Sequence, residues 1–260
     1  MKMQVKTSGQ GPPLVLVPEG LTGWLSLEPH TERLSGTRKV VNVQLFNVEY
    51  GFRNRELPSD YSVKMESWAL GVALDEIGIS HSLDFMAWSY GALITLDYAL
   101  DNPERVRSLT LIEPPAFWLL HALGEVNEET RQIEDFLRSL QGDISEDKLE
   151  QFLYTVGLCP PGQSARQLPQ WPLCVKYRQS LRNDAAILKH EDDPQRLRAF
   201  QKPVLLVQGT GSGSLNHQIT GLLAKLLPKA KVIELPGGHA AHIVSMDRFL
   251  DEMNKFQTEV

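Results

Sequence analysis

Residues 82–100 read SLDFMAWSYGALITLDYAL, and they are the most informative stretch of the chain. The first half is typical of a buried strand and the second half of a helix. Ser89 lies at the junction, with the small residues Ala87 and Gly91 two positions to either side. A serine on a tight strand-to-helix turn is the nucleophile-elbow pattern, in which bulk at either flanking position would collide with the neighbouring backbone. Because the hydroxyl then projects at a helix N-terminus, where developing negative charge is favoured, we predict that Ser89 is a nucleophile.

Short apolar runs alternate with helical patterns along most of the chain. The apolar runs predict strands at residues 14–17, 40–46, 83–88, 106–112, 203–207 and 231–235. Apolar residues at helical spacing predict helices at residues 62–77, 89–102, 216–227 and 246–256. This alternation predicts an α/β fold, with a mostly parallel central sheet and helices on both faces.

Residues 114–198 break the alternation, because they contain helical patterns only. We expect helices there at residues 117–123, 128–140, 145–156 and 173–182. We interpret this insertion as a helical cap over the carboxyl ends of the strands, where open α/β sheets bind ligands. The predicted organisation is therefore a core of residues 1–113 and 199–260, with a cap of residues 114–198.

The composition excludes several classes of partner. The chain has 260 residues, is 42% hydrophobic and carries a net charge of −6, which argues against nucleic acid and anionic membranes as partners. It has no apolar leader and no run near the ~18 apolar residues of a membrane span. Cys159 and Cys174 have no metal-binding spacing around them, so we expect free thiols and a soluble, cytoplasmic protein. A homodimer is compatible with this composition.

A histidine follows the last predicted strand. Residues 235–242 read LPGGHAAH, and the paired glycines form a loop that can present His239 toward the carboxyl edge of the sheet. A loop histidine alone is more often a surface residue, but its place after the last strand of a chain with a serine elbow makes His239 the predicted general base. His242 has the weaker claim, and we expect it to pack at a helix start or to be exposed.

A third segment, Val17-Pro18-Glu19-Gly20-Leu21, ends the first central strand. A glycine there allows a backbone N–H to turn toward the serine. We predict that the N–H groups of Gly20 and Tyr90 form an oxyanion hole for a tetrahedral intermediate. The alternative is that Pro-Glu-Gly is only a turn signal.

Together these segments resemble the α/β-hydrolase-fold superfamily over nearly the whole chain. The resemblance implies a serine nucleophile, Ser89, and a histidine base, His239. It also implies an acid after the strand at residues 203–207, in a Gly-x-x-Asp arrangement. This chain instead reads Gly-Thr-Gly-Ser at residues 209–212, so Ser212 stands where the aspartate belongs, and no carboxylate occurs up to His217.

Glu113 offers a replacement, since it ends the strand that follows the nucleophile strand. Zearalenone-type lactonases and some haloalkane dehalogenases carry their acid at this strand end. The lactonases also resemble this chain in a Pro-acid-Gly-Leu turn, here residues 18–21. A carboxylate is needed to hold the histidine tautomer and stabilise the imidazolium. We therefore predict Glu113 as the triad acid, the alternative being a glutamate that only caps a helix or anchors a loop.

A serine nucleophile indicates acyl transfer to water, with an ester, lactone or thioester as the scissile group. The aromatic content suggests an apolar small-molecule substrate. The candidate pocket residues are Trp24, Trp88, Trp118, His121, Trp171 and Tyr177, with Phe117 also considered. We expect no cofactor and no metal, because no Rossmann glycine pattern, phosphate-binding loop or metal-ligand cluster is visible in the sequence.

Two other functions remain open at this point. The same fold and triad support hydrolysis of a carbon–carbon bond in a β-diketone-like or ring-cleavage product. The missing acid at Ser212 also makes a non-catalytic ligand-binding receptor on a hydrolase scaffold an alternative.

Overall fold

The computed structural model describes residues 2–79, 82–160 and 162–260. A seven-stranded sheet has the order β1-β3-β2-β4-β5-β6-β7, in which only β1 is antiparallel to its neighbour. The strands are β1 (Gln4–Ser8), β2 (Pro13–Val17), β3 (Lys39–Gln44), β4 (Leu83–Trp88), β5 (Val106–Ile112), β6 (Val204–Gly209) and β7 (Ala230–Leu235). Because all but β1 run in one direction, the carboxyl ends of six strands share one edge of the sheet.

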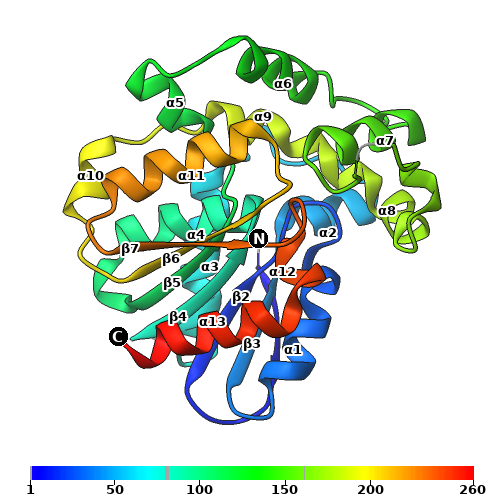
Figure 1. Ribbon diagram of the computed structural model, residues 1–260. Helices are drawn as coiled ribbons and strands as arrows, with labels where there is room; N and C mark the ends of the chain where they lie inside the picture. Colours follow the sequence, from blue (N-terminus) through cyan, green and yellow to red (C-terminus); the bar gives the residue numbers. More distant parts are fainter. Residues whose placement is uncertain (1, 80–81, 161) are drawn as a thin grey trace.

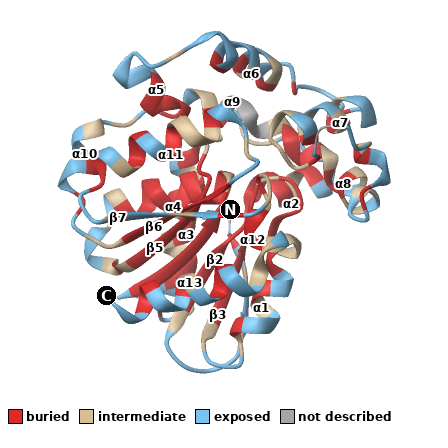
Figure 2. Ribbon diagram, viewed as in Figure 1, coloured by how far each residue is buried: buried red, intermediate tan, exposed pale blue. Residues whose placement is uncertain are grey.

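Helices cover both faces of this sheet (Figure 1). The alternation of side chains along β2 separates the two layers: Leu14 and Leu16 pack toward α1 and α13, and Val15 and Val17 pack toward α3, α4 and α11. These helices are α1 (Glu28–Leu34), α3 (Val63–Glu76), α4 (Tyr90–Asp101), α11 (Ser214–Leu226) and α13 (Met246–Thr258). Figure 2 shows the buried residues concentrated in the central strands. The predicted α/β class and its mostly parallel sheet are confirmed.

Several elements of the core, among them β1, α1 and α2, were not expected from the sequence. The edge strand β1 reads QVKTS, with most of its side chains exposed or half-buried, so it lacks the apolar run used to find the others. The run at residues 40–46 was expected to be one strand, but β3 ends at Gln44 and Phe46 begins α2 (Phe46–Phe52). The apolar residues continue across this boundary, so hydrophobicity alone does not mark it.

The segment between β5 and β6 contains helices and 3₁₀ turns. Its helices are α5 (Phe117–Leu123), α6 (Glu128–Arg138), α7 (Glu146–Thr155), α8 (Trp171–Tyr177), α9 (Asp184–Lys189) and α10 (Pro194–Ala199). The helix expected at residues 173–182 is shorter, since α8 ends at Tyr177 and a 3₁₀ turn, η4 (Arg178–Asn183), follows. Figure 1 shows α5 to α9 above the sheet and α10 beside the core helix α11.

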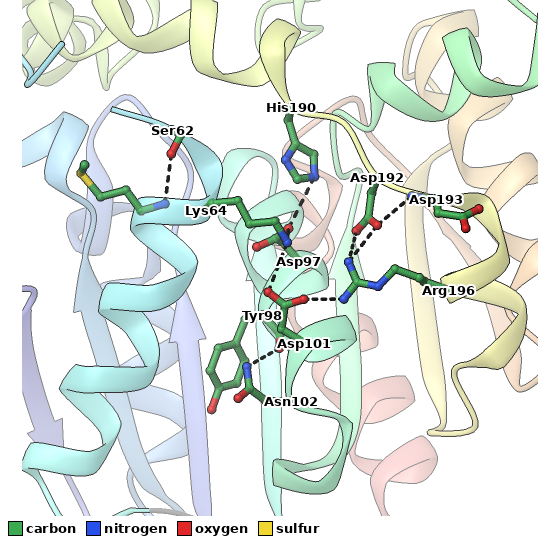
Figure 3. A network of polar contacts seen from close by, with 11 residues as sticks. Ser62, Lys64, Asp97, Tyr98, Asp101, Asn102, His190, Asp192, Asp193 and Arg196 are labelled. Carbon is green, nitrogen blue, oxygen red and sulfur yellow. Dashed lines mark hydrogen bonds and ion pairs between the residues drawn. The ribbon is translucent and has the colours of Figure 1, made fainter. Parts of the chain in front are cut away.

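A network of charged side chains ties the end of this segment to the core (Figure 3). Lys64 on α3 places its Nζ 2.7 Å from Asp97 and 3.1 Å from Asp101, both on α4. Arg196 on α10 pairs with Asp101 and, at 2.8 Å to each oxygen, with Asp192. The network therefore joins α10 and the segment before it to both α3 and α4.

Three members of the network have the residue types of a metal site. Asp97, His190 and Asp192 bring one ligand atom each to within 4.8 Å of one another. Lys64 and Arg196 already supply positive charge to the two carboxylates, however. Burial lowers the pKa of His190, which favours its neutral form. The cluster is therefore explained as an anchor between elements.

The two cysteines and the histidines His30 and His242 are buried in the interior. Cys159 and Cys174 are buried and unpaired, as predicted. His242, on the short helix α12 (Ala241–Val244), is fully buried, and its ring stacks on that of His30 at a centroid distance of 5.1 Å. Within the described ranges, no helix is both long and apolar enough to cross a membrane.

The buried histidine pair predicts a loss of stability in mild acid. Burial lowers the pKa of His30 to about 4 and that of His242 well below its ordinary value. The unfolded chain binds these protons near pH ~6.5, so the free energy of unfolding should fall as the pH drops below that value. For His30 alone we expect a loss of about 2 kcal/mol between pH 8 and pH 5. Urea unfolding over this range should show a shallower decline in His30→Phe than in the wild type. Parallel declines would contradict this assignment.

Candidate active site

Ser89 occupies a strained turn between β4 and α4. Its backbone has φ 53° and ψ −122°, a conformation that is uncommon outside glycine. The Ser89 N–H donates to the Ile112 carbonyl at 2.8 Å, which holds the turn against the end of β5. At Gly91, a Cβ would lie 2.2 Å from the Pro18 carbonyl oxygen, so only glycine fits there. The two requirements of the elbow pattern, a sharp turn and a small residue after it, are therefore met.

Glu113 follows β5 directly and has a positive φ of 44°. It is buried, and its Oε1 accepts from the Gly209 N–H at 2.7 Å and from the Ser212 hydroxyl at 2.5 Å. Its Oε2 accepts from Asn216 Nδ2 at 2.7 Å and lies 2.6 Å from Nδ1 of His239. Burial alone would raise the pKa of this carboxyl, but its hydrogen bonds with His239, Ser212 and Gly209 hold the pKa below its ordinary value.

His239 is held on both sides of its loop. Its backbone N–H donates to the Gly157 carbonyl at 3.1 Å, and its own carbonyl accepts from Trp88 Nε1 at 3.0 Å. Because an ionised carboxylate can only accept hydrogen bonds, the contact with Glu113 requires the proton to be on Nδ1. Nε2 of the neutral ring is then the nitrogen that can accept a proton.

Ser212 and Asn216 support Glu113, and sequence reasoning missed this role. Ser212 takes the position where the family's aspartate is expected, yet it serves as a donor to the acid at the next strand end. Asn216 lies in the first turn of α11 and donates to the oxygen that also contacts His239. The sequence offered one signal for this role. Asn216 is a polar residue in the first turn of the helix that follows position 212, where the acid is missing.

The turn after β2 is organised by its own glutamate. The Glu19 carboxylate accepts from the Leu21 N–H, and it accepts from both the N–H and the hydroxyl of Thr22 at 2.7 Å. Glu19 is buried, and this burial raises its pKa despite those hydrogen bonds. The two residues predicted to supply the oxyanion hole, Gly20 and Tyr90, line the same cavity as Ser89.

That cavity lies between the strand ends and the helical segment. Ser89, Glu113 and His239 line it from the core, together with Trp88. The remaining wall is mainly aliphatic and comes largely from the helical segment and α11. It includes Phe117, Ile133, Leu137, Phe152, Leu181, Ile187, Leu215 and Ile219. The site therefore has polar groups at the strand ends beneath a mainly apolar wall, to which Glu129 and Thr155 add two polar side chains.

Most of the aromatic residues expected in the pocket do not line this cavity. The expectation is corrected for Trp24, Trp118, His121, Trp171 and Tyr177. Each of them contacts another side chain instead. Lys6 lies over the ring of Trp24 at 4.1 Å, and Arg166 lies over that of Trp171 at 5.5 Å. His190 packs against Trp118 at 6.3 Å, Phe52 stacks on Tyr177 at 4.8 Å, and Glu134 is bonded to His121 at 2.5 Å. Trp118 and Tyr177 are buried, Trp118 against His190 in the helical segment and Tyr177 against Phe52 of α2.

Comparisons with known proteins agree with this geometry. The family profile described as "alpha/beta hydrolase fold" matches residues 13–245. A putative carbamate hydrolase, RutD, of Klebsiella pneumoniae is 26% identical over 255 residues, which cover 92% of this chain and 89% of that protein. Among solved structures, a thermophilic esterase from Thermogutta terrifontis has a TM-score of 0.78 at 15% identity, covering 99% of this chain and 93% of that one. A meta-cleavage product hydrolase from Pseudomonas fluorescens IP01 has a TM-score of 0.75 at 16% identity, with coverages of 99% and 94%. The match of the family profile over most of the chain shows that this protein belongs to the α/β-hydrolase-fold family of enzymes.

Proposed function

We propose that the protein is a cofactor-free serine hydrolase that cleaves an ester or lactone of an apolar small molecule. Ser89 is the nucleophile, His239 the general base and Glu113 the acid. The observation that carries the proposal is the 2.6 Å contact between Glu113 Oε2 and His239 Nδ1, in a cavity that Ser89 also lines.

The proposed reaction begins with the Ser89 hydroxyl, which attacks the substrate carbonyl as His239 Nε2 takes its proton. The N–H groups of Gly20 and Tyr90 stabilise the resulting oxyanion. The imidazolium, paired with Glu113, then gives its proton to the leaving alcohol, and an acyl group remains on Ser89. Water attacks this acyl-enzyme with the same histidine as base, which releases the acid and restores the serine.

The substrate class follows from the wall of the cavity. The aliphatic side chains favour an apolar acyl or alcohol group, because its burial would displace water from them. The proposed triad and the turn after β2 supply polar groups beside Ser89, where the scissile carbonyl would bind. The name of the relative adds carbamates to the substrates that should be tested. Carbon–carbon bond hydrolysis, which the same triad supports, should be tested beside them.

A fluorophosphonate probe tests the proposed function directly. We expect covalent labelling of the wild type that maps to Ser89 and disappears in Ser89→Ala. Hydrolysis is then compared for p-nitrophenyl esters of increasing chain length, an aromatic lactone, an aryl carbamate and a β-diketone. We expect the highest kcat/KM with an ester or lactone that carries an apolar group. A protein that binds apolar ligands but is never labelled would be a receptor on a hydrolase scaffold, and the proposal would fall.

A further inference from the structure

Glu66, on α3, is a fully buried carboxylate outside the proposed triad. Its Oε1 accepts from the Tyr61 hydroxyl at 2.7 Å and from the Asn47 N–H at 3.2 Å. Because α2 begins at Phe46 and has no side-chain cap at Leu45, Glu66 stabilises the first turn of that helix in place of a cap.

One branch of this hydrogen-bond network leads to the residue after the nucleophile. The Tyr61 hydroxyl lies 3.0 Å from the Tyr90 hydroxyl. Since the Tyr61 proton is donated to Glu66, the Tyr90 hydroxyl is the donor in the second contact. The relay from Tyr90 through Tyr61 to Glu66 therefore fixes the side chain of the residue whose N–H is assigned to the oxyanion hole.

The other branch leads to the turn after β2. Asn47, whose backbone is bonded to Glu66, uses its side-chain Nδ2 to donate to the Gly20 carbonyl at 2.5 Å. The same Nδ2 donates to the Ser180 carbonyl at 3.1 Å, in the helical segment. This branch therefore reaches the second residue assigned to the oxyanion hole.

The two branches meet at Gly20. A Cβ at that position would lie 3.2 Å from Cδ1 of Tyr90 and 3.3 Å from Nδ2 of Asn47. Gly20 is thus packed against the Tyr90 and Asn47 side chains, which end the two branches. A shift of either branch would move one assigned N–H group relative to the other, and oxyanion stabilisation depends steeply on donor placement.

We propose that Glu66, in its anionic form, is a positioning residue that sets the spacing of the Gly20 and Tyr90 N–H groups. The inference rests on the proposed function, because it assigns those two groups to the oxyanion hole. An anionic carboxylate makes shorter and stronger hydrogen bonds to its donors than a neutral one does. A protonated Glu66 would weaken both branches together.

Protonation of Glu66 falls in an accessible pH range. Burial raises the pKa of Glu66 to about 7, and the hydrogen bonds from Tyr61 and Asn47 offset only part of that rise. The titratable side chains along its branches are Tyr61 and Tyr90, and burial raises the pKa of Tyr61 well above its ordinary value, so Tyr61 stays neutral. The carboxyl should therefore be mostly charged at pH 8 and mostly neutral at pH 5.5.

The test compares the rate at which a fluorophosphonate labels Ser89 in the wild type and in Glu66→Gln, from pH 5.5 to pH 9. Glutamine resembles the protonated carboxyl in shape and charge. We expect labelling of the wild type to be about tenfold faster at pH 8, which is a fraction of the 10²–10³ that loss of a whole oxyanion donor costs. The two rates should converge at pH 5.5. Any pH dependence that does not involve residue 66 is common to both proteins and cancels in the ratio.

Two further variants make the result specific. Tyr61→Phe breaks only the Tyr90 branch. We expect its labelling rate to fall less than that of Glu66→Gln, with the same pH dependence of the ratio to the wild type. If Glu66→Gln fails to fold, Tyr61→Phe provides the test. Asp84→Asn is the matched control, since Asp84 is a buried carboxylate on β4 that is bonded to Arg38, Arg107 and Ser108. Its labelling rate should equal that of the wild type at every pH.

A ratio that stays constant with pH would assign Glu66 a purely structural role and overturn the inference. Wild-type labelling of Ser89 would leave the proposed function standing in that case. A wild type that is not labelled at any pH would instead contradict the proposed function, and this inference with it.

Discussion

Ser89→Ala and His239→Ala should each lower kcat on p-nitrophenyl butyrate by roughly 10⁴- to 10⁶-fold, and the double variant should be little slower than either. The reason is that the two side chains carry out one proton transfer, so removing either stops it. Residual hydrolysis would come from substrate binding and the oxyanion N–H groups, which neither variant removes. Steady-state kinetics on the three variants, after circular dichroism has confirmed their folding, measures this.

The matched control is His121→Ala. His121 was another candidate for the pocket, but it bonds to Glu134 and does not line the cavity. We expect its kcat and KM to stay within about twofold of the wild type, as is usual for a substitution remote from the site. If the reduction of kcat in the double variant Ser89→Ala/His239→Ala equalled the product of the two single reductions, the two residues would not act as a unit.

Glu113→Gln should lower kcat by on the order of 10²–10⁴ while the protein remains folded. Glutamine can still accept from Gly209 and Ser212, so the strand ends should stay joined. It cannot stabilise the imidazolium with a negative charge, and its amide can favour the wrong tautomer of His239. The measurements are the pH dependence of kcat and the midpoint temperature of thermal unfolding, each for the wild type and for Glu113→Gln.

A second variant uses position 212, where the family's aspartate is expected and this chain has a serine. In Glu113→Gln, an added Ser212→Asp places a carboxylate at the position that donates to Glu113 in the wild type. We expect it to restore part of the lost kcat, because the new carboxylate would lie near Nδ1 of His239. Full activity of Glu113→Gln alone would show that Glu113 only anchors the loop.

The local sequence was sufficient for the strand–turn–helix at Ser89 and for the loop that carries His239. In both cases a short apolar strand ends at small residues, and the constraint lies within a few positions along the chain. The contact between Glu113 and His239 was also anticipated, from the missing acid at Ser212 and the resemblance to lactonases that carry their acid at this strand end; β5 and β7 both end at the carboxyl edge of the sheet. These features depend on the hydrophobic periodicity and on the order of strands and helices along the chain, and both can be read from the sequence.

The tertiary structure alone decided which side chains face the cavity. The aromatic candidates were chosen by residue type, but Trp118 and Tyr177 are buried against other side chains, and aliphatic residues such as Ile133 line the site. The environment of Glu66 is a similar case. Its partner Asn47 lies on α2 and Tyr90, which it reaches through Tyr61, lies on α4, so packing of α2, α3 and α4 brings them together. A sequence shows that such residues must be buried, but helix packing determines what each one meets, because the direction of a side chain depends on the rotation and tilt of its helix.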